Sequence, residues 1–256
     1  MTQLKGKRVL ITGATAGIGE ACAIQFARQG CNLVITGRRT ERLKELSKKL
    51  SSEFGVRVDT LAFDVSNRAE TEKALSSIDL SDIAVLVNNA GLARGTESMQ
   101  KANIDDWEVM VDTNIKGLLY VTRTLIPKML QKNEGHIVNI GSVAGRWVYP
   151  GGGVYCATKF AVRALSEGLR FDLLGTPIRI TNIEPGMVET DFSKTRFDGD
   201  TEKAAAVYKG MNPLKANDIA ETALWCVMRP AHVNIQELVI FPTDQAAVGP
   251  YVHRRA

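Results

Sequence analysis

Short runs of apolar, β-branched residues alternate along the chain with longer stretches of helical periodicity. Continuous apolar runs predict strands that are buried on both faces of a sheet. Seven strands are expected, at Arg8–Thr12, Leu33–Thr36, Val56–Ala62, Ile83–Val87, His136–Ile140, Ile178–Ile183 and Leu238–Phe241. Six helices are expected between them, at residues 18–30, 40–53, 67–78, 104–131, 154–174 and 216–229. This alternation predicts an α/β protein with a doubly wound, parallel, seven-stranded sheet and helices on both faces.

No repeat, low-complexity tract or linker divides the chain, so we expect residues 1–256 to form a single Rossmann-type domain. One segment departs from the alternation: residues 191–212 are polar, aromatic and charged, and they precede the last helix. Ligands of doubly wound sheets bind beyond the carboxyl ends of the strands, where a long irregular segment can cover them. We therefore expect residues 191–212 to form a substrate lid.

The composition excludes several classes of function. The 256 residues are 45% hydrophobic, and 32 Lys and Arg against 28 Asp and Glu leave a net charge of +4. This charge is too small and scattered for a nucleic-acid surface. The four cysteines and three histidines form no C-x-x-C pair or close cluster, so we expect no metal site and no disulfide framework. We find no secretion signal and no run near the roughly 20 apolar residues of a membrane span, and we expect a cytoplasmic protein.

A glycine-rich turn follows the first predicted strand and opens a helix. Glycines allow the backbone to turn tightly and approach a ligand, and the free N–H groups of a helix start bind a pyrophosphate. The G-x-x-x-G-x-G spacing departs from the common G-x-G-x-x-G dinucleotide fingerprint, so a turn without a ligand is the alternative. The place of the turn in the first βαβ unit favours dinucleotide binding by Gly13, Thr15, Ala16, Gly17 and Ile18.

Arg38 and Arg39 follow the second predicted strand, where NAD-binding proteins usually carry an acidic residue for the ribose 2′-hydroxyl. A guanidinium fork accepts bidentate bonds from a phosphate and can stack on adenine. The two arginines therefore predict a 2′-phosphate and a preference for NADP(H). The alternative is that they are solvated charges at the start of a basic helix.

Tyr155 and Lys159 are four residues apart in a predicted helix and so project from one face, while Ser142 follows the fifth strand. A phenol with a pKa of about 10 is a poor base at neutral pH, but an adjacent ammonium and a positively charged nicotinamide would favour the phenolate. The serine hydroxyl can orient a substrate oxygen. Asn114, within the predicted helix 104–131, can break that helix and anchor a water. The alternatives are a core tyrosine, a surface lysine and an ordinary helical asparagine.

Together these residues resemble the motif set of the short-chain dehydrogenase/reductases, in the right order and from about residue 7 to the C-terminus. The motifs are T-G-x-x-x-G-I-G at 12–19, N-N-A-G at 88–91, Asn114, Ser142, Y-x-x-x-K at 155–159 and Pro185-Gly186. Stretches such as GATAGIGEACA, TGRRTERL and EPGMVETDFS are more similar still to the NADP-dependent 3-hydroxy acid dehydrogenases. Those enzymes oxidise serine, allo-threonine and 3-hydroxypropionate-type substrates.

The resemblance implies a Ser142–Tyr155–Lys159 triad with Asn114 as its fourth member, in which Tyr155 carries the proton and the nicotinamide the hydride. It implies a homotetramer in which the helices around 104–131 and 154–174 pack between subunits. It also implies further cofactor contacts, at Asp64, Val65, Asn89, Gly91, Tyr155, Lys159, Pro185, Gly186, Val188 and Thr190. From composition alone, turn capping explains the residues after the third and fourth strands equally well.

A 3-hydroxy acid presents a carboxylate, for which a bidentate arginine is the best partner. Arg94, Arg146 and Arg196 flank the expected pocket, and the lid residue Arg196 lies in T-R-F-D-G-D, which resembles a lid motif of the 3-hydroxy acid group. We expect Arg146 or Arg196 to bind the substrate anion and Ser142 its hydroxyl. Solvated loop arginines are the alternative.

Other functions stay open at this stage. A sulfonate presents the same oxygens to an arginine, so a sulfoacetaldehyde reductase or a general carbonyl reductase of the family, acting on an aldehyde or ketone, is the second candidate. A non-catalytic NADP(H)-binding protein is the third. The basic tail Pro250–Ala256 packs on a neighbouring subunit or is disordered.

Overall fold

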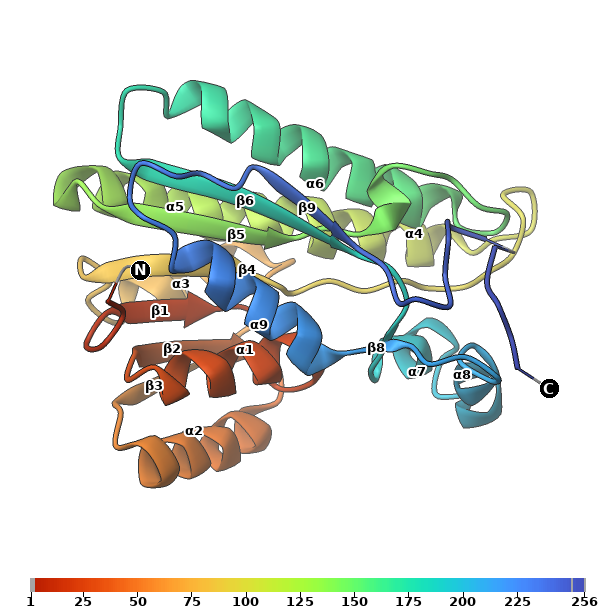
Figure 1. Ribbon diagram of the computed structural model, residues 1–256, viewed down its shortest axis with the longest axis horizontal. Helices are drawn as coiled ribbons and strands as arrows, with labels where there is room; N and C mark the ends of the chain where they lie inside the picture. Colours follow the sequence, from red (N-terminus) through yellow and green to blue (C-terminus); the bar gives the residue numbers. More distant parts are fainter. Residues whose placement is uncertain (1–2, 250, 256) are drawn as a thin grey trace.

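The structure is built around a parallel sheet. The computed structural model describes residues 3–249 and 251–255, and their main sheet has seven strands in the order β3-β2-β1-β4-β5-β6-β9 (Figure 1). Each pair of neighbouring strands is parallel. The strands are β1 (Arg8–Ile11), β2 (Asn32–Gly37), β3 (Val58–Ala62), β4 (Ile83–Asn88), β5 (Gly135–Ile140), β6 (Ile178–Pro185) and β9 (Glu237–Ile240). The predicted doubly wound sheet is confirmed.

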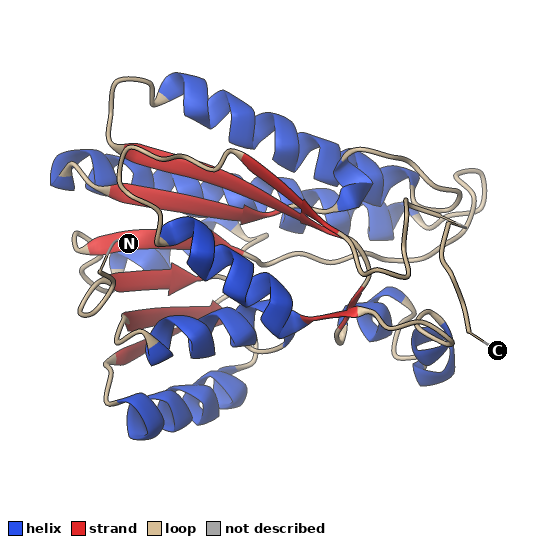
Figure 2. Cartoon of the chain, viewed as in Figure 1, coloured by secondary structure: helices blue, strands red, loops and turns tan. Residues whose placement is uncertain are grey.

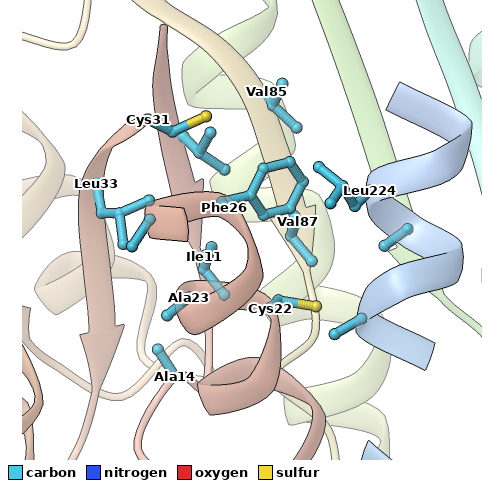
Figure 3. Close-up of a cluster of buried hydrophobic side chains, with 14 of the residues drawn as sticks. Ile11, Ala14, Cys22, Ala23, Phe26, Cys31, Leu33, Val85, Val87 and Leu224 are labelled. Atoms are coloured by element: carbon cyan, nitrogen blue, oxygen red, sulfur yellow. The ribbon is translucent and has the colours of Figure 1, made fainter. Parts of the chain in front are cut away.

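Helices cover both faces of this sheet, as Figure 2 shows. The helices on one face are α1 (Gly17–Arg28), α2 (Thr40–Phe54) and α9 (Ala216–Val227). Those on the other face are α3 (Arg68–Ser76), α5 (Leu118–Lys132) and α6 (Gly153–Asp172). The central strands β4 and β5 are buried at every position, which explains their continuous apolar runs. On the first face, Phe26 of α1 packs with Ile11, Val87 and Leu224 (Figure 3).

A buried polar network fixes the carboxyl end of β4 relative to β5 and two helices. The Asn88 amide donates to Thr122 Oγ1 at 2.8 Å and to Asn139 Oδ1 at 2.9 Å. The Asn139 amide donates in turn to Ser166 Oγ at 2.8 Å. Because buried polar groups are costly unless they are paired, these bonds select one register of strands and helices. The loops that follow β4 and β5 therefore start from fixed positions.

The helix predicted over 104–131 is interrupted. It consists of α4 (Ile104–Val111), a π-helical turn over Asp112–Gly117, and α5. The buried Asn114 lies in that turn, where its Oδ1 accepts from Leu92 N and its Nδ2 donates to Leu92 O, both at 2.8 Å. The expected local break at Asn114 is therefore present, and it ties this helix to the loop after β4.

Residues 191–212 are more regular than expected. They contain the short helices α7 (Phe192–Arg196) and α8 (Thr201–Ala206), between β7 (Val188–Glu189) and β8 (Leu214–Lys215), which pair in parallel. Helices of five and six residues are too short to show a periodicity in the sequence. The segment lies beyond the carboxyl ends of the sheet strands (Figure 1), where a lid was expected.

The described part of the C-terminal tail, residues 251–255, contacts its own chain. Val252 bridges Gln245, and the Arg255 N–H donates to the carbonyl of Gly210 at 2.6 Å. The Arg254 guanidinium donates to the carbonyl of Val207 at 3.0 Å. The tail thus packs on the end of the α7–α8 segment, while Pro250 and Ala256 lie outside the described residues.

Two kinds of feature are missing from the residues described. None of their helices combines the length and the apolar character that crossing a bilayer requires. Nor do they contain a group of three or more His, Cys, Asp or Glu side chains arranged to hold a metal ion.

Candidate active site

A cavity of about 700 Å³ lies at the carboxyl ends of the parallel strands. Residues that are far apart in the sequence meet there, as the doubly wound topology predicts. The predicted site residues that line it are Gly13, Thr15, Ala16, Gly17, Ile18, Arg38, Arg39, Asn89, Gly91, Ser142, Tyr155, Lys159, Pro185, Gly186, Val188, Thr190 and Arg196. The predicted residues outside its lining are Asp64, Val65, Asn114 and Arg146.

The glycine-rich turn is a tight cradle at one end of the cavity. Gly13 has a φ of +65°, and a Cβ on Gly19 would lie 2.4 Å from the Gly13 carbonyl oxygen, so both positions require glycine. Helix α1 starts at Gly17, and its N-cap residue, Ala16, offers no side chain to the first N–H groups. The helix start therefore keeps backbone donors for a ligand, which fits a pyrophosphate.

Arg38 and Arg39 stand beside this turn but differ in their partners. The Arg39 Nη2 donates to the Thr15 carbonyl at 2.8 Å, which ties the end of β2 to the glycine-rich turn. The Arg38 side chain is 66% exposed and its Nη1 lies 3.5 Å from Asp64 Oδ2. Asp64 thus forms an ion pair with Arg38 although it does not line the cavity. Val65, the next residue, is buried. The cavity end is edged by two guanidiniums, which fits a 2′-phosphate.

Ser142, Tyr155 and Lys159 meet at the other end of the cavity. Ser142 caps a 3₁₀ turn over Val143–Gly145, where its Oγ accepts from Ala144 N at 3.1 Å. It is also close enough to the Tyr155 phenol to lower the pKa of that group. Tyr155 and Lys159 come from α6, and each is 8% exposed. The Lys159 Nζ donates to the Ile140 carbonyl at 2.8 Å and lies 6.0 Å from the centroid of the Tyr155 ring.

Burial is the main cause of the pKa shifts of Tyr155 and Lys159. It raises the pKa of Tyr155 above its usual value, and the nearby Tyr149 phenol adds to that rise, while the Ser142 hydrogen bond and the charge of Arg196 lower it by less. Burial also lowers the pKa of Lys159 to about 8. The expectation that Lys159 and a positively charged nicotinamide together favour the phenolate stays a prediction; within the protein itself the amine bonds the Ile140 carbonyl, and burial outweighs the charge of Arg196 at the phenol.

Asn114 lies behind the wall of the cavity. Besides its two bonds to Leu92, its Nδ2 donates to Thr158 Oγ1 at 3.0 Å, next to Lys159 in the chain. A Cβ on Gly91 would lie 3.2 Å from Asn114 Oδ1 and 3.7 Å from Lys159 Nζ. Asn114 therefore fixes the loop after β4 against the part of α6 that carries the lysine.

Arg196 of α7 lies over the Tyr155 ring, with 6.0 Å between its Cζ and the ring centroid. Its Nη1 donates to Tyr149 Oη at 2.9 Å and its Nε to the Gly95 carbonyl at 3.2 Å. Backbone hydrogen bonds and, to a smaller extent, the charges of Lys203 and Arg196 lower the pKa of Glu97, so one carboxylate lies near Arg196 without forming an ion pair with it in the described part of the chain. Arg196 thus presents a positive charge to the cavity beside the phenol.

The other two candidate arginines do not face the cavity. Arg146 is hydrogen-bonded and ion-paired to Glu184 and Glu237, and none of the three lines the cavity. Arg94 pairs with Asp198 and donates to the Thr195 carbonyl at 3.2 Å, so it holds the α7–α8 segment. Of the two arginines expected to bind the substrate anion, the structure brings only Arg196 to the cavity, because two carboxylates distant in sequence hold Arg146 elsewhere.

Several lining residues were not identified individually from the sequence. Phe192 packs on Tyr155 with 5.6 Å between ring centroids, and Tyr208 donates to the Val188 carbonyl at 2.8 Å. Tyr149, in the loop before α6, also lines the cavity. The aromatic content of residues 191–212 signalled a lid as a whole, but it did not single out Phe192 or Tyr208.

Comparisons with known proteins agree with this geometry. The "NADP-dependent 3-hydroxy acid dehydrogenase YdfG" of Salmonella typhi is 50% identical over 249 residues, which is 96% of this chain and 99% of that one. The "Serine 3-dehydrogenase" of Agrobacterium fabrum is 45% identical over 250 residues, 97% of this chain and 98% of the other. A structure described as "The Closed form of serine dehydrogenase complexed with NADP+" is 49% identical, covers 97% of this chain and 100% of its own, and has a TM-score of 0.90.

A family model described as short chain dehydrogenase matches residues 7–201. This range contains the glycine-rich turn and the Ser142, Tyr155 and Lys159 cluster, so the match covers both ends of the cavity. The chain belongs to the short-chain dehydrogenase family.

Proposed function

We propose that this protein is an NADP(H)-dependent oxidoreductase that interconverts small 3-hydroxy acids of the serine, allo-threonine and 3-hydroxypropionate type with their carbonyl forms. The observation that carries the proposal is one cavity with a phosphate cradle and two arginines at one end, and Ser142, Tyr155 and Arg196 at the other. The names of the relatives support the cofactor and the substrate class. A panel of hydroxy acids, sulfoacetaldehyde and neutral carbonyl compounds, followed by NADPH absorbance, tests it.

The cofactor is proposed to lie along the cavity. The glycine-rich turn and the start of α1 would hold its pyrophosphate, Arg38 and Arg39 its 2′-phosphate, and Asn89, Gly91, Val188 and Thr190 would lie along it. Pro185 and Gly186, at the end of β6, would line the nicotinamide end with Lys159. When bound, the nicotinamide accepts or supplies the hydride.

This chain's own residues would handle the substrate oxygen and its proton. Ser142 and Tyr155 would both hydrogen-bond that oxygen, since their hydroxyls are neighbours and both line the cavity. The raised pKa of Tyr155 keeps the phenol protonated at neutral pH, as the donor role in carbonyl reduction requires. In the reverse direction the same oxygen would take the hydroxyl proton, which becomes easier as pH rises. Lys159, with a pKa of about 8, would supply the local positive charge.

The substrate anion is proposed to bind Arg196. Its guanidinium lies over the Tyr155 ring, so a carboxylate one carbon away from the reacting carbon could reach it. A sulfonate would be accepted in the same way, and sulfoacetaldehyde is therefore the second candidate substrate. Since Arg196 belongs to α7, residues 191–212 would act as a lid whose closed form completes the substrate site.

We further propose a cytoplasmic homotetramer. Apolar side chains are exposed along the helices expected to pack between subunits, with Val109 on α4, Leu119 on α5, and Phe160 and Phe171 on α6. Exposed apolar residues gathered on neighbouring helices are typical of an interface. The mass of the protein in solution tests this assembly, and a monomer at micromolar concentration contradicts it.

We expect Tyr155→Phe to bind NADPH as the wild type does but to lose about 10²- to 10⁴-fold in kcat, because it lacks only the phenolic oxygen. Steady-state kinetics and NADPH fluorescence titration measure the two quantities. Tyr120→Phe, on α5 and outside the cavity lining, is the matched control and should leave kcat unchanged. Near-normal turnover of Tyr155→Phe would remove this residue from the reaction.

Replacing both Arg38 and Arg39 by alanine should weaken NADPH binding by about 10- to 100-fold and leave NADH binding nearly unchanged, because charge-assisted bonds to the 2′-phosphate are lost. The ratio of kcat/KM for the two cofactors measures this change. Arg42→Ala is the control, since Arg42 lies on the same helix start but pairs with Glu45 at 2.9 Å. A wild type that uses both cofactors equally well would contradict the assignment.

Arg196→Met should raise the KM for 3-hydroxypropionate by about 10- to 100-fold while that for its methyl ester stays the same, because only the acid offers a carboxylate to the guanidinium. Arg94→Met is the control: it removes a contact to the α7–α8 segment but keeps the Arg196 guanidinium, so it should affect acid and ester alike. An equal loss with acid and ester would show that Arg196 acts on the segment and not on the anion.

The buried amine predicts a pH-dependent stability. The pKa of Lys159 is about 8 in the folded protein against an ordinary 10.5, so below pH 8 the fold carries the cost of a buried ammonium. Lys159→Met should therefore be more stable than the wild type at pH 7, and the difference should shrink as pH rises from 8 to 10.5, where the folded lysine loses its proton first.

Thermal unfolding of dialysed wild type and Lys159→Met across this pH range measures the difference. Lys101→Met, which removes an exposed ammonium, is the control and should follow the wild type at each pH. A stability difference that does not change with pH would show that Lys159 is not desolvated in the folded protein.

A further inference from the structure

The turn that carries Ser142 is enclosed between β6 and α6. The Gly141 N–H donates to the Ile183 carbonyl at 2.7 Å, which fixes the start of the turn on β6. A Cβ on Gly141 would lie 2.5 Å from Asn182 Oδ1, and a Cβ on Gly145 would lie 2.7 Å from the Lys159 carbonyl oxygen. Backbone packing therefore fixes Gly141 and Gly145. The next residue, Arg146, is held by its side chain.

Arg146 provides that anchor through two carboxylates on different strands. Its Nε donates to Glu184, on β6, and its Nη2 donates to Glu237, the first residue of β9. The Glu184 side chain is completely buried, and the Glu237 side chain is 20% exposed. A guanidinium has two donor edges in one plane and can bridge two carboxylates, which the single ammonium of a lysine does less well.

The carboxylates also have partners that do not belong to the turn. Arg163, on α6, places its Nε 3.0 Å from Glu237 Oε1 and 4.0 Å from Glu184 Oε1. Asn182 Nδ2 donates to Glu184 Oε1 at 2.8 Å. Two arginines and two glutamates thus form a cluster with equal numbers of positive and negative groups, in which Arg146 is the residue that directly follows the turn in the chain. Removing Arg146 would release the turn, while Arg163 and Asn182 would still contact the carboxylates.

We infer that Arg146 is a positioning residue: its two ion pairs fix the turn over Ser142–Gly145 so that the Ser142 hydroxyl holds the substrate oxygen beside the Tyr155 phenol. This inference rests on the proposed function, in which Ser142 and Tyr155 share that oxygen. Arg146 acts only through the turn, since it lies outside the cavity lining. It should therefore affect turnover and not the binding of NADPH.

The first experiment compares Arg146→Met with Arg163→Met, which removes the other guanidinium of the same cluster. Arg146→Met should lower kcat on the order of 10- to 100-fold, the loss that a displacement of about 1 Å in a reacting group can cause. The NADPH dissociation constant should stay unchanged in both variants, and kcat should be retained in Arg163→Met. Retained kcat in Arg146→Met, or an equal loss in both variants, overturns the inference.

A second comparison separates positioning from stability. Arg146→Met leaves Glu184 buried with less neutralising charge and should lower the midpoint of thermal unfolding. Adding Glu184→Gln removes that charge, so the double variant should regain the midpoint but not kcat. If it regains both, Arg146 has only a structural role and the inference fails. The double variant also replaces the single one if the latter does not fold.

The same series distinguishes this inference from the proposed function. A wild type that oxidises 3-hydroxypropionate with NADP⁺, and loses this activity in Tyr155→Phe, supports the function independently of Arg146. Arg146→Lys, which keeps the charge and loses the fork, should have a kcat between those of the wild type and Arg146→Met. A kcat of Arg146→Lys equal to that of the wild type would show that the charge alone is enough, and would contradict a role for the fork that bridges both carboxylates.

Discussion

The structure depends on keeping a phenol and an amine buried side by side at the carboxyl end of a parallel sheet. Desolvation opposes charge on both: it raises the pKa of Tyr155 and lowers that of Lys159 to about 8. Such groups persist only where fixed polar partners hold them, and here these are the Ile140 carbonyl for the amine and the Ser142 hydroxyl for the phenol. Both partners come from the end of β5. The position of β5 relative to α6 therefore decides where the two side chains lie in the cavity.

The surrounding fold provides that position through polar contacts at the points where loops leave the sheet. Asn88 and Asn139 join β4 to β5, and Asn114 joins the loop after β4 to the helix turn beside Lys159. Each contact is buried, so a shift of one element would leave unpaired polar groups in the interior. A packed apolar core alone tolerates small sliding movements between helix and sheet. The hydrogen bonds of the asparagines are directional, so they restrict such movements and fix the distances between the groups that line the cavity.

The sequence was sufficient for features that depend on neighbours in the chain. Continuous apolar runs predicted all the strands of the main sheet, and the glycine spacing predicted the cradle at Gly13–Gly19. The sequence was insufficient to predict contacts between distant residues. Arg146 pairs with Glu184, 38 residues away, and with Glu237, 91 residues away, and no local sequence pattern indicates either pair. Helices α7 and α8 are shorter than the window in which periodicity appears. The burial of Tyr155 and Lys159 could not be predicted from the sequence either, because their spacing places both on one helix face but does not show the desolvation that they share.

The arginines around the cavity illustrate why residue type alone does not assign an anion site. A guanidinium attracts an anionic ligand more strongly when no carboxylate of the protein already pairs with it. Arg146 has two carboxylate partners and Arg94 has one, so each is neutralised within the protein. Among the described residues Arg38 also has one carboxylate partner, Asp64 at 3.5 Å, whereas Arg39 and Arg196 bond carbonyl and hydroxyl oxygens, which orient a guanidinium without cancelling its charge. The least compensated guanidiniums, Arg39 and Arg196, thus lie at the two ends of the cavity. An acid with a carboxylate near its hydroxyl, together with a cofactor carrying a 2′-phosphate, matches both ends at once.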